Sequence, residues 1–332
     1  MKKRLLQAVS TFLLLLLFAT GCKSAPLAQN AAFATPDGTD STANISVVAT
    51  IFPPYDFVRQ IAGEHVSLTM LLPPGAESHS FEPTPKDIIA IQNCDVFLYV
   101  GGDSDAWIDD ILDSMDTSSI RIIRLMDFVT AVEEEIVEGM EDDHGQHEDE
   151  QDEAEEAEYD EHVWTSPKNA QLIVSGISEA LCAADAANKA SYEDNTEAYL
   201  TKLQELDTAF QAVVDNAARK TIVFGDRFPF RYFADAYGLS YFAAFPGCST
   251  ETEASAGTVA FLIDKIKAEQ LPVVFHIELS NEKMADSIAE ATGAKKLLLH
   301  ACHNISKADF ERGTTYLELM NNNVSALKEA LS

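Results

Sequence analysis

Residues 189–217 have the sequence KASYEDNTEAYLTKLQELDTAFQAVVDNA. Apolar side chains recur in it at steps of three, four or seven residues, as on one face of an α-helix; they are Tyr192, Tyr199, Leu203, Leu206, Phe210, Val213 and Val214. A helix over this range would be about 43 Å long, which is longer than one small lobe requires. We therefore predict a rigid helix over residues 188–218 that runs along two lobes.

Short apolar runs alternate with helix-like segments on both sides of this helix. The strands predicted from these runs are residues 45–50, 67–72, 94–101 and 120–125 before the helix, and 221–225, 241–245, 272–278 and 295–300 after it. Continuous apolar runs are typical of parallel strands buried on both faces. The sequence therefore predicts an α/β fold with two lobes, residues 44–187 and 219–332, each built on a parallel four-stranded sheet. A ligand site would lie between the lobes, at the carboxyl ends of the strands.

Capping signals locate three of the intervening helices. Thr84 is followed by Pro85 and, three residues after the cap, by Asp87, while Ser166 is followed by Pro167. A Ser or Thr cap with proline at the first helical position is a typical helix start. We predict a third helix from residue 280 to a stop at Gly293.

The N-terminus is typical of an exported lipoprotein. Basic residues at positions 2–4 precede an apolar stretch over residues 11–20, which is too short for a comfortable transmembrane helix. The stretch ends in Ala19-Thr20-Gly21-Cys22, which resembles a bacterial lipobox. We predict a signal peptide over residues 1–21, a lipid anchor on Cys22 at the extracytoplasmic face of the cell membrane, and a flexible tether over residues 22–43. The alternative is an ordinary signal peptide followed by a cysteine that is not acylated.

The formal charge of −31 excludes nucleic acid as a partner, because such a field repels phosphate backbones and attracts cations. Residues 133–161 alone hold 17 acidic residues and no Lys or Arg, so we predict that they form a mobile, solvated loop. His144 and His147 lie inside this loop. Two imidazoles among carboxylates would capture a divalent metal weakly; the alternative is a solvated insertion with no role in metal binding.

Four potential metal ligands lie at the ends of predicted strands or loops. His79 lies in the loop after the second strand, His162 closes the acidic loop, Asp226 follows the strand at 221–225, and His300 ends the strand at 295–300. Three imidazoles and one carboxylate form a closed tetrahedral set that suits Zn²⁺. The sequence therefore predicts a metal site built from His79, His162, Asp226 and His300.

Two further residues near this set have weaker signals. Glu278, at the exit of the strand at 272–278, could orient a ligand or supply an oxygen. His303 lies in a polar loop, and we expect it to be solvated; the alternative is that it supports a ligand from behind. No GxSxG, HExxH or P-loop motif is present. A closed site also lacks an open position for activated water, so we predict a binding protein and not an enzyme, with a zinc hydrolase as the least favoured alternative.

Four cysteines remain if Cys22 is acylated: Cys94, Cys182, Cys248 and Cys302. An even count in an exported protein favours two disulfides. Cys248 and Cys302 both follow strands at one edge of the second lobe, so we predict a Cys248–Cys302 bridge, which leaves Cys94–Cys182 as the second pair. Free buried thiols are the alternative.

Two segments carry a family resemblance. His79-Ser80-Phe81-Glu82-Pro83-Thr84-Pro85 and residues 162–170, HVWTSPKNA, resemble the metal-ligand motifs of the zinc and manganese solute-binding lipoproteins of ABC transporters. The resemblance extends over residues 45–331. It implies two lobes with little hinge motion, and a monomer that holds a metal ion at the lobe interface and delivers it to a membrane permease.

The resemblance also bears on the choice of metal. Zinc-type relatives have a histidine where this chain has Asp226 and an aspartate where it has His300, so the two exchanges preserve three histidines and one aspartate. An acidic, histidine-bearing insertion is likewise a feature of zinc members. Both features favour Zn²⁺, with a Mn²⁺ or iron receptor of the same family as one alternative. A surface adhesin with a structural metal is the alternative from another class.

Overall fold

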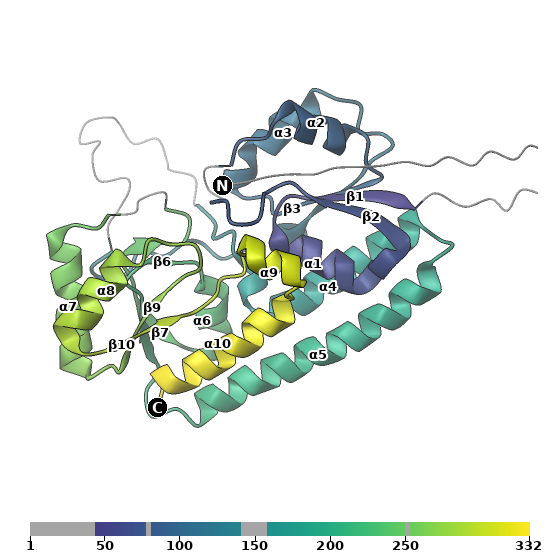
Figure 1. The fold of residues 1–332 in the computed structure, drawn as a ribbon. Helices are drawn as coiled ribbons and strands as arrows, with labels where there is room; N and C mark the ends of the chain where they lie inside the picture. The colour runs from purple at the N-terminus through teal and green to yellow at the C-terminus, as the bar shows by residue number, and fades with distance from the viewer. Residues whose placement is uncertain (1–43, 78–80, 141–157, 250–252) are drawn as a thin grey trace, which may run out of the picture. The chain divides into compact units, whose positions relative to one another are not determined.

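The predicted long helix is helix α5, Lys189–Asp215, in the computed structural model, which describes residues 44–77, 81–140, 158–249 and 253–332. The apolar face of α5 is buried along the helix, from Tyr192 to Val214. It packs against α1 (Phe52–Ala62) and α4 (Pro167–Ala184) near its start and against α6 (Arg231–Tyr237) and α10 (Tyr316–Ala330) further along (Figure 1). The helix therefore joins the two halves of the body, as predicted.

The first half is a parallel four-stranded sheet. Its strands, in the order β2-β1-β3-β4, are Val66–Met70, Ile45–Ala49, Val96–Tyr99 and Arg121–Arg124. Because side chains alternate along a strand, Val96 and Leu98 enter the core that α1 shares, whereas Phe97 packs with α2 (Pro85–Gln92) and α3 (Ala106–Asp113) on the other face. Short 3₁₀ turns at Gly63–His65, Asp103–Asp105, Leu125–Phe128 and Val163–Thr165 complete this half.

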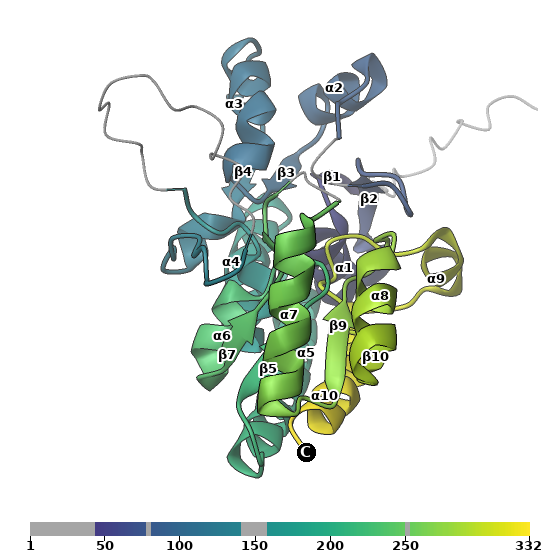
Figure 2. The ribbon, with the colours of Figure 1, turned by 90° about the vertical axis from the view of Figure 1, so that its left-hand side faces the viewer.

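The second half has shorter strands than predicted. Strand β5 (Thr221–Val223) pairs with β7 (Ser240–Phe242), and β9 (Val273–His276) pairs with β10 (Lys295–Leu298), all in parallel. One bridge, from Phe224 to Phe275, joins the two pairs into the predicted four-strand arrangement. A separate short pair consists of β6 (Arg227–Phe228) and β8 (Phe245–Pro246). Helices α7 (Ala256–Glu269) and α8 (Lys283–Thr292) cover one face of this half (Figure 2), and α9 is Lys307–Arg312.

The predicted helix starts are confirmed at two of three positions. Thr84 and Asp87 form a reciprocal capping box at the start of α2, and α4 begins at Pro167. Helix α8, however, starts three residues later than predicted. The Ser280 hydroxyl donates to the carbonyl of Ile277 and so completes a turn after β9 instead of capping the helix.

Buried and partly buried hydrogen bonds connect the two halves. The indole N–H of Trp164 donates to the Ala301 carbonyl at 2.7 Å, and the Tyr316 hydroxyl donates to the Trp164 carbonyl at 2.7 Å. The Asn304 side chain donates to the carbonyls of Pro73 and Ala76 at 2.8 and 2.9 Å. Breaking the two buried bonds of Trp164 would leave buried carbonyls unsatisfied, so these bonds restrain the halves against separation.

The two predicted disulfides are wrong, because all four of these cysteines are free in the structure. Three of the thiols lie near backbone carbonyls in their own neighbourhoods. Cys94 donates to the Ile91 carbonyl, Cys182 to that of Lys189 and Cys302 to that of His300. Burial raises the pKa of the Cys248 thiol well above its usual value, which keeps the thiol protonated and unreactive.

Several predictions concern segments outside the described residues: the signal peptide, Cys22, the tether, His79, and the middle of the acidic loop with His144 and His147. Over the described part of the chain, no helix is both long enough and apolar enough to cross a membrane.

Candidate metal site

A small cavity of about 30 Å³ has walls from both halves of the body. Its ionisable wall residues are Glu77, His162, Arg227, Glu278 and His303. A volume of this size is close to the space of one water molecule, so the cavity suits an ion better than an organic ligand.

His162 is the most deeply buried of these side chains, with no exposed surface. It precedes the 3₁₀ turn Val163–Thr165, and its Nδ1 lies 3.2 Å from Oδ1 of Asp160, which also accepts the His162 backbone N–H at 2.7 Å. Burial acts to lower the pKa of His162, but the carboxylates of Asp160, Glu161 and Glu134 together outweigh burial, and the net shift is upward. A proton held on Nδ1 by Asp160 puts the imidazole lone pair on Nε2, which is the arrangement of a metal-binding histidine.

His303 contributes a second imidazole from the loop after β10. Its ring lies 5.1 Å from the His162 ring, at 89°, and 5.0 Å from the Trp164 ring. The prediction of a solvated His303 is therefore wrong, because the loop turns this side chain into the cavity wall.

Glu278 fixes the loop that carries His303. Its Oε2 accepts the Ala301 N–H at 2.7 Å and its Oε1 accepts the His303 N–H at 2.9 Å. A carboxylate has about four lone-pair positions, so Glu278 can hold the loop and still face an ion. Leu279 (φ 60°) and Cys302 (φ 62°) adopt left-handed backbone on either side of this contact, and such strain in non-glycine residues concentrates at functional sites.

The other two predicted ligands in the described chain lie behind the cavity wall. The Asp226 carboxylate accepts the N–H groups of Arg227 at 2.9 Å and Ile277 at 3.2 Å. His300 accepts the Cys302 N–H on Nδ1 at 2.9 Å. Neither side chain lines the cavity. The structure therefore brings His162 together with His303 and Glu278, and it uses Asp226 and His300 to hold the supporting loops.

The fourth predicted ligand, His79, lies outside the described residues, but Glu77, two positions earlier, lines the cavity. Within the described ranges, no three His, Cys, Asp or Glu side chains converge closely enough to hold a metal ion by themselves. The described wall is thus an incomplete ligand set.

The C-terminal end of the acidic loop, at Asp160 and Glu161, is buried, contrary to the prediction of a solvated loop. Glu133 and Tyr159 form an antiparallel bridge, and Asp160 and Glu161 are buried beside His162. Glu161 accepts the Ser104 N–H at 2.6 Å, and burial raises the pKa of its carboxyl to about 7. Acidic composition alone could not reveal this, because Asp160 and Glu161 have the same acidic character as the rest of the run.

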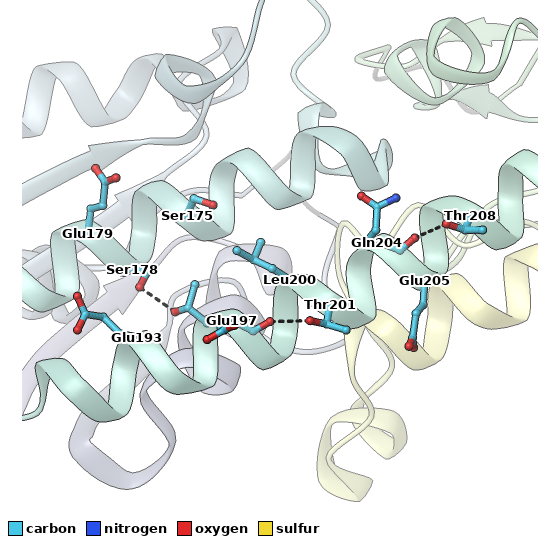
Figure 3. A pocket seen from close by; sticks show the side chains of 11 residues that line it. Ser175, Ser178, Glu179, Glu193, Glu197, Leu200, Thr201, Gln204, Glu205 and Thr208 are labelled. Carbon is cyan, nitrogen blue, oxygen red and sulfur yellow. Dashed lines mark hydrogen bonds between the residues drawn. The ribbon is translucent and has the colours of Figure 1, made fainter.

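A much larger cavity, of about 800 Å³, lies along helices α4 and α5 (Figure 3). Its wall consists of Ser, Thr, Glu and Gln side chains with Leu200, and it includes no His or Cys. Several of its hydroxyls donate to carbonyls of their own helix, and Thr196 of α5 also donates to the Ser178 hydroxyl of α4 at 2.7 Å. The wall lacks the nitrogen and sulfur ligands that zinc prefers, so the small cavity is the better metal site.

Comparison with known proteins decides the family. The model of the family "Zinc-uptake complex component A periplasmic" matches residues 47–330. The chain belongs to this family. It is similar to the high-affinity zinc uptake system protein ZnuA of Bacillus subtilis, with 34% identity over 86% of this chain and 88% of that protein. The zinc-binding lipoprotein AdcA of Streptococcus pneumoniae is 30% identical over 86% of this chain; there the match spans only 55% of the relative.

Solved structures agree with this assignment. The metal-dependent lipoprotein YcdH of B. subtilis has a TM-score of 0.73 at 30% identity, covering 87% of this chain and all of that one. The Zn(II)-bound ZnuA-like domain of S. pneumoniae AdcA has a TM-score of 0.71 at 27% identity, with coverage of 87% and 99%. The laminin-binding protein Lmb of Streptococcus agalactiae, described as an adhesin with metal-transporting activity, has a TM-score of 0.71 at 26% identity, with coverage of 87% and 100%. These relatives belong to a transport family and not to an enzyme class.

Proposed function

We propose that this protein captures Zn²⁺ outside the cytoplasm and delivers it to an ABC-type importer. The observation that carries the proposal is the position of the buried His162. Asp160 orients its ring, and it shares an ion-sized cavity with His303 and Glu278. The chain that forms this cavity belongs to a zinc-uptake family. Imidazole nitrogens with one carboxylate oxygen form a ligand set that zinc prefers.

Two ligand sets are open to test. The sequence pattern gives His79, His162, Asp226 and His300. The cavity wall favours a set in which Glu278 and His303 replace Asp226 and His300, with His79 supplied by the loop that starts after Glu77. Both sets contain three histidines and one carboxylate, so both favour zinc over the harder Mn²⁺. They differ in which loop residues reach the ion.

The remaining parts of the proposal are supported by the similarity to zinc-binding lipoproteins and by the N-terminal sequence. Acylation of Cys22 would hold the protein, as a monomer, on the extracytoplasmic face of the membrane near its permease partner. His144 and His147 in the acidic loop would act as a weak auxiliary site that collects zinc. None of these roles requires catalysis.

A metal-dependent thermal shift tests the proposal. Ligands that bind only the native state raise its stability in proportion to the logarithm of their concentration over Kd. Chelator-treated protein should therefore melt at a higher temperature with added Zn²⁺ than with equal Mn²⁺, and the shift should be much reduced in His162→Ala. A larger shift with Mn²⁺ would favour the manganese alternative, and no shift with either metal would refute metal capture.

Adhesion is a second candidate, favoured only by the similarity to Lmb. A solid-phase binding assay on immobilised laminin, run with zinc-loaded and chelator-treated protein, tests it. Absence of binding in both forms would remove this candidate and leave the zinc proposal unaffected.

A further inference from the structure

Tyr232 is a buried residue of the second half whose hydroxyl lies at the base of the acidic loop. Residues 132–134 and 158–160 pair there in an antiparallel arrangement, which we call the loop base. Within it, the Asp160 N–H donates to the Val132 carbonyl at 3.0 Å. Tyr232 reaches this pairing from helix α6, and it is only 4% exposed.

The Tyr232 hydroxyl takes the place of one backbone bond in the loop base. In an antiparallel pair of this kind, two opposite residues exchange both of their N–H···O bonds. The Val132 N–H instead donates to the Tyr232 hydroxyl at 3.2 Å, and this hydroxyl donates to the Asp160 carbonyl at 2.8 Å. Burial raises the pKa of the hydroxyl to about 12, so it stays protonated and can accept one bond while donating the other. It therefore holds the two backbones apart at Asp160.

The residue held in this way is the one that orients His162. The Asp160 carboxylate accepts the His162 backbone N–H at 2.7 Å and lies 3.2 Å from Nδ1 of the ring. Without the hydroxyl, a direct bond of about 2.9 Å between Val132 and Asp160 could replace the two successive contacts. Such a closure would move Asp160 toward Val132 and draw its carboxylate away from the ring.

We propose that Tyr232 is a positioning residue for zinc binding: its hydroxyl separates Val132 from Asp160, keeps the Asp160 carboxylate on Nδ1 of His162 and so directs Nε2 into the cavity. This inference rests on the proposed zinc function and deepens it, because a residue of the second half would set the orientation of a ligand next to the first. Tyr232 is itself not one of the described wall residues. The alternative is that its hydroxyl only stabilises the fold.

Tyr232→Phe removes the hydroxyl alone, and Tyr237→Phe is its matched control. Tyr237 lies in the same helix, is also 4% exposed, and donates its hydroxyl to the Asp207 carboxylate of α5 at 2.8 Å. Zinc affinity is measured by indicator competition on the full chain after chelator treatment, with circular dichroism to check the fold. The affinity should fall on the order of tenfold in Tyr232→Phe and stay within about twofold of the wild type in Tyr237→Phe.

A double-mutant cycle tests whether Tyr232 acts through Asp160. Asp160→Ala removes the carboxylate, so adding Tyr232→Phe to this variant should lower zinc affinity no further, whereas independent effects would add.

Nuclear magnetic resonance of the metal-free protein gives a second readout, which also serves if Asp160→Ala does not fold. The chain is labelled with ¹⁵N-histidine and measured at a pH where the His162 ring is neutral, and its signals are identified by their loss in His162→Gln. The wild type and Tyr237→Phe should carry the proton on Nδ1. Tyr232→Phe should show a mixture of the two neutral tautomers, which a purely structural role of the hydroxyl would not produce.

The outcomes separate this inference from the zinc function. Equal zinc affinities in Tyr232→Phe and Tyr237→Phe, additive losses in the cycle, or an unchanged His162 tautomer in Tyr232→Phe would overturn the role of Tyr232 and leave zinc binding in place. Failure of the wild type to bind zinc would instead refute the proposed function, and the tautomer comparison would still test whether Tyr232 orients His162.

Discussion

The imidazole rings of His162 and His303 meet almost at right angles, with their centroids 5.1 Å apart. One ring comes from the end of the acidic loop and the other from the loop after β10, so the pair spans the two halves of the body. Trp164 packs against both rings and donates its indole N–H to the same β10 loop, at Ala301. The relative position of the two imidazoles is thus fixed by buried contacts.

The first prediction separates the two ligand sets. Because His303 lines the cavity and His300 does not, His303→Ala should lower zinc affinity by orders of magnitude, and His300→Gln should lower it by less than about tenfold. Indicator competition on metal-free protein measures both, with far-ultraviolet circular dichroism as the folding control. The reverse order of effects would restore His300 and Asp226 as ligands.

The second prediction concerns the close approach of Gly247 to His162. A Cβ at position 247 would lie 3.2 Å from His162 Cε1, 3.0 Å from the Phe228 carbonyl oxygen and 3.1 Å from Pro229 Cα. Such contacts are tight enough to displace the imidazole, so Gly247→Ala should weaken zinc binding severalfold at nearly unchanged stability. Gly257→Ala, whose new Cβ would lie no closer than 3.3 Å to the Ser255 hydroxyl, is the matched control. Equal zinc affinity in the two variants would show that the ring tolerates the contact.

The third prediction uses the carboxyl group of Asp105. Burial raises the pKa of this carboxyl from 3.8 to about 6, so the folded state holds its proton more tightly than the unfolded state does. Its contribution to stability is therefore greatest at low pH and is lost as the pH rises from about 4 to about 6. Both backbone donors, Val100 N–H and Gly101 N–H, bind the same oxygen, Oδ2.

In the variant Asp105→Asn, the side-chain amide oxygen could accept both of these bonds without any charge. The variant should therefore be more stable than the wild type at pH 7.5 by roughly 1–3 kcal/mol and should lose most of this advantage at pH 4.5. Urea unfolding of metal-free protein at the two pH values measures the difference. A variant that is destabilised equally at both pH values would mean that Asp105 is needed as an anion.

The fourth prediction concerns the link between the halves. Trp164→Phe removes the donor to the buried Ala301 carbonyl and should cost about 1–3 kcal/mol of unfolding free energy. It should also weaken zinc binding, because the β10 loop carries His303. Trp107→Phe, at a half-buried indole that packs on Phe81, controls for the change in ring size. Equal stabilities of the two variants would argue that the Trp164 bond is dispensable.

The sequence predicted the backbone better than the site. Short runs rich in apolar and β-branched residues located the four strands of the first sheet, and the spacing from Tyr192 to Val214 located α5. The strands of the second sheet were harder to predict because they are short. Strand Thr221–Val223, for example, ends where the chain turns into the separate β6–β8 pair. Apolar composition continues through that turn and gives no sign of it.

The ligand prediction was limited by side-chain direction. A position at the end of a strand tells which edge of the sheet a residue lies on, but not where its side chain points. Neighbouring residues on a strand point in different directions. Arg227 therefore lines the cavity, whereas the adjacent Asp226 does not. Between His300 and His303 the chain passes through Cys302 at φ 62°. A left-handed cysteine is not predictable from local sequence preference, and this turn decides which histidine lines the cavity.

The most direct measurement is the position of the ion itself. A zinc-edge anomalous difference map from crystals of the zinc-loaded protein should place the strongest peak about 2.0–2.2 Å from a ring nitrogen of both His162 and His303, and from an oxygen of Glu278. A peak bound instead by Asp226 and His300, or one confined to the acidic loop with no density beside His162, would contradict this account.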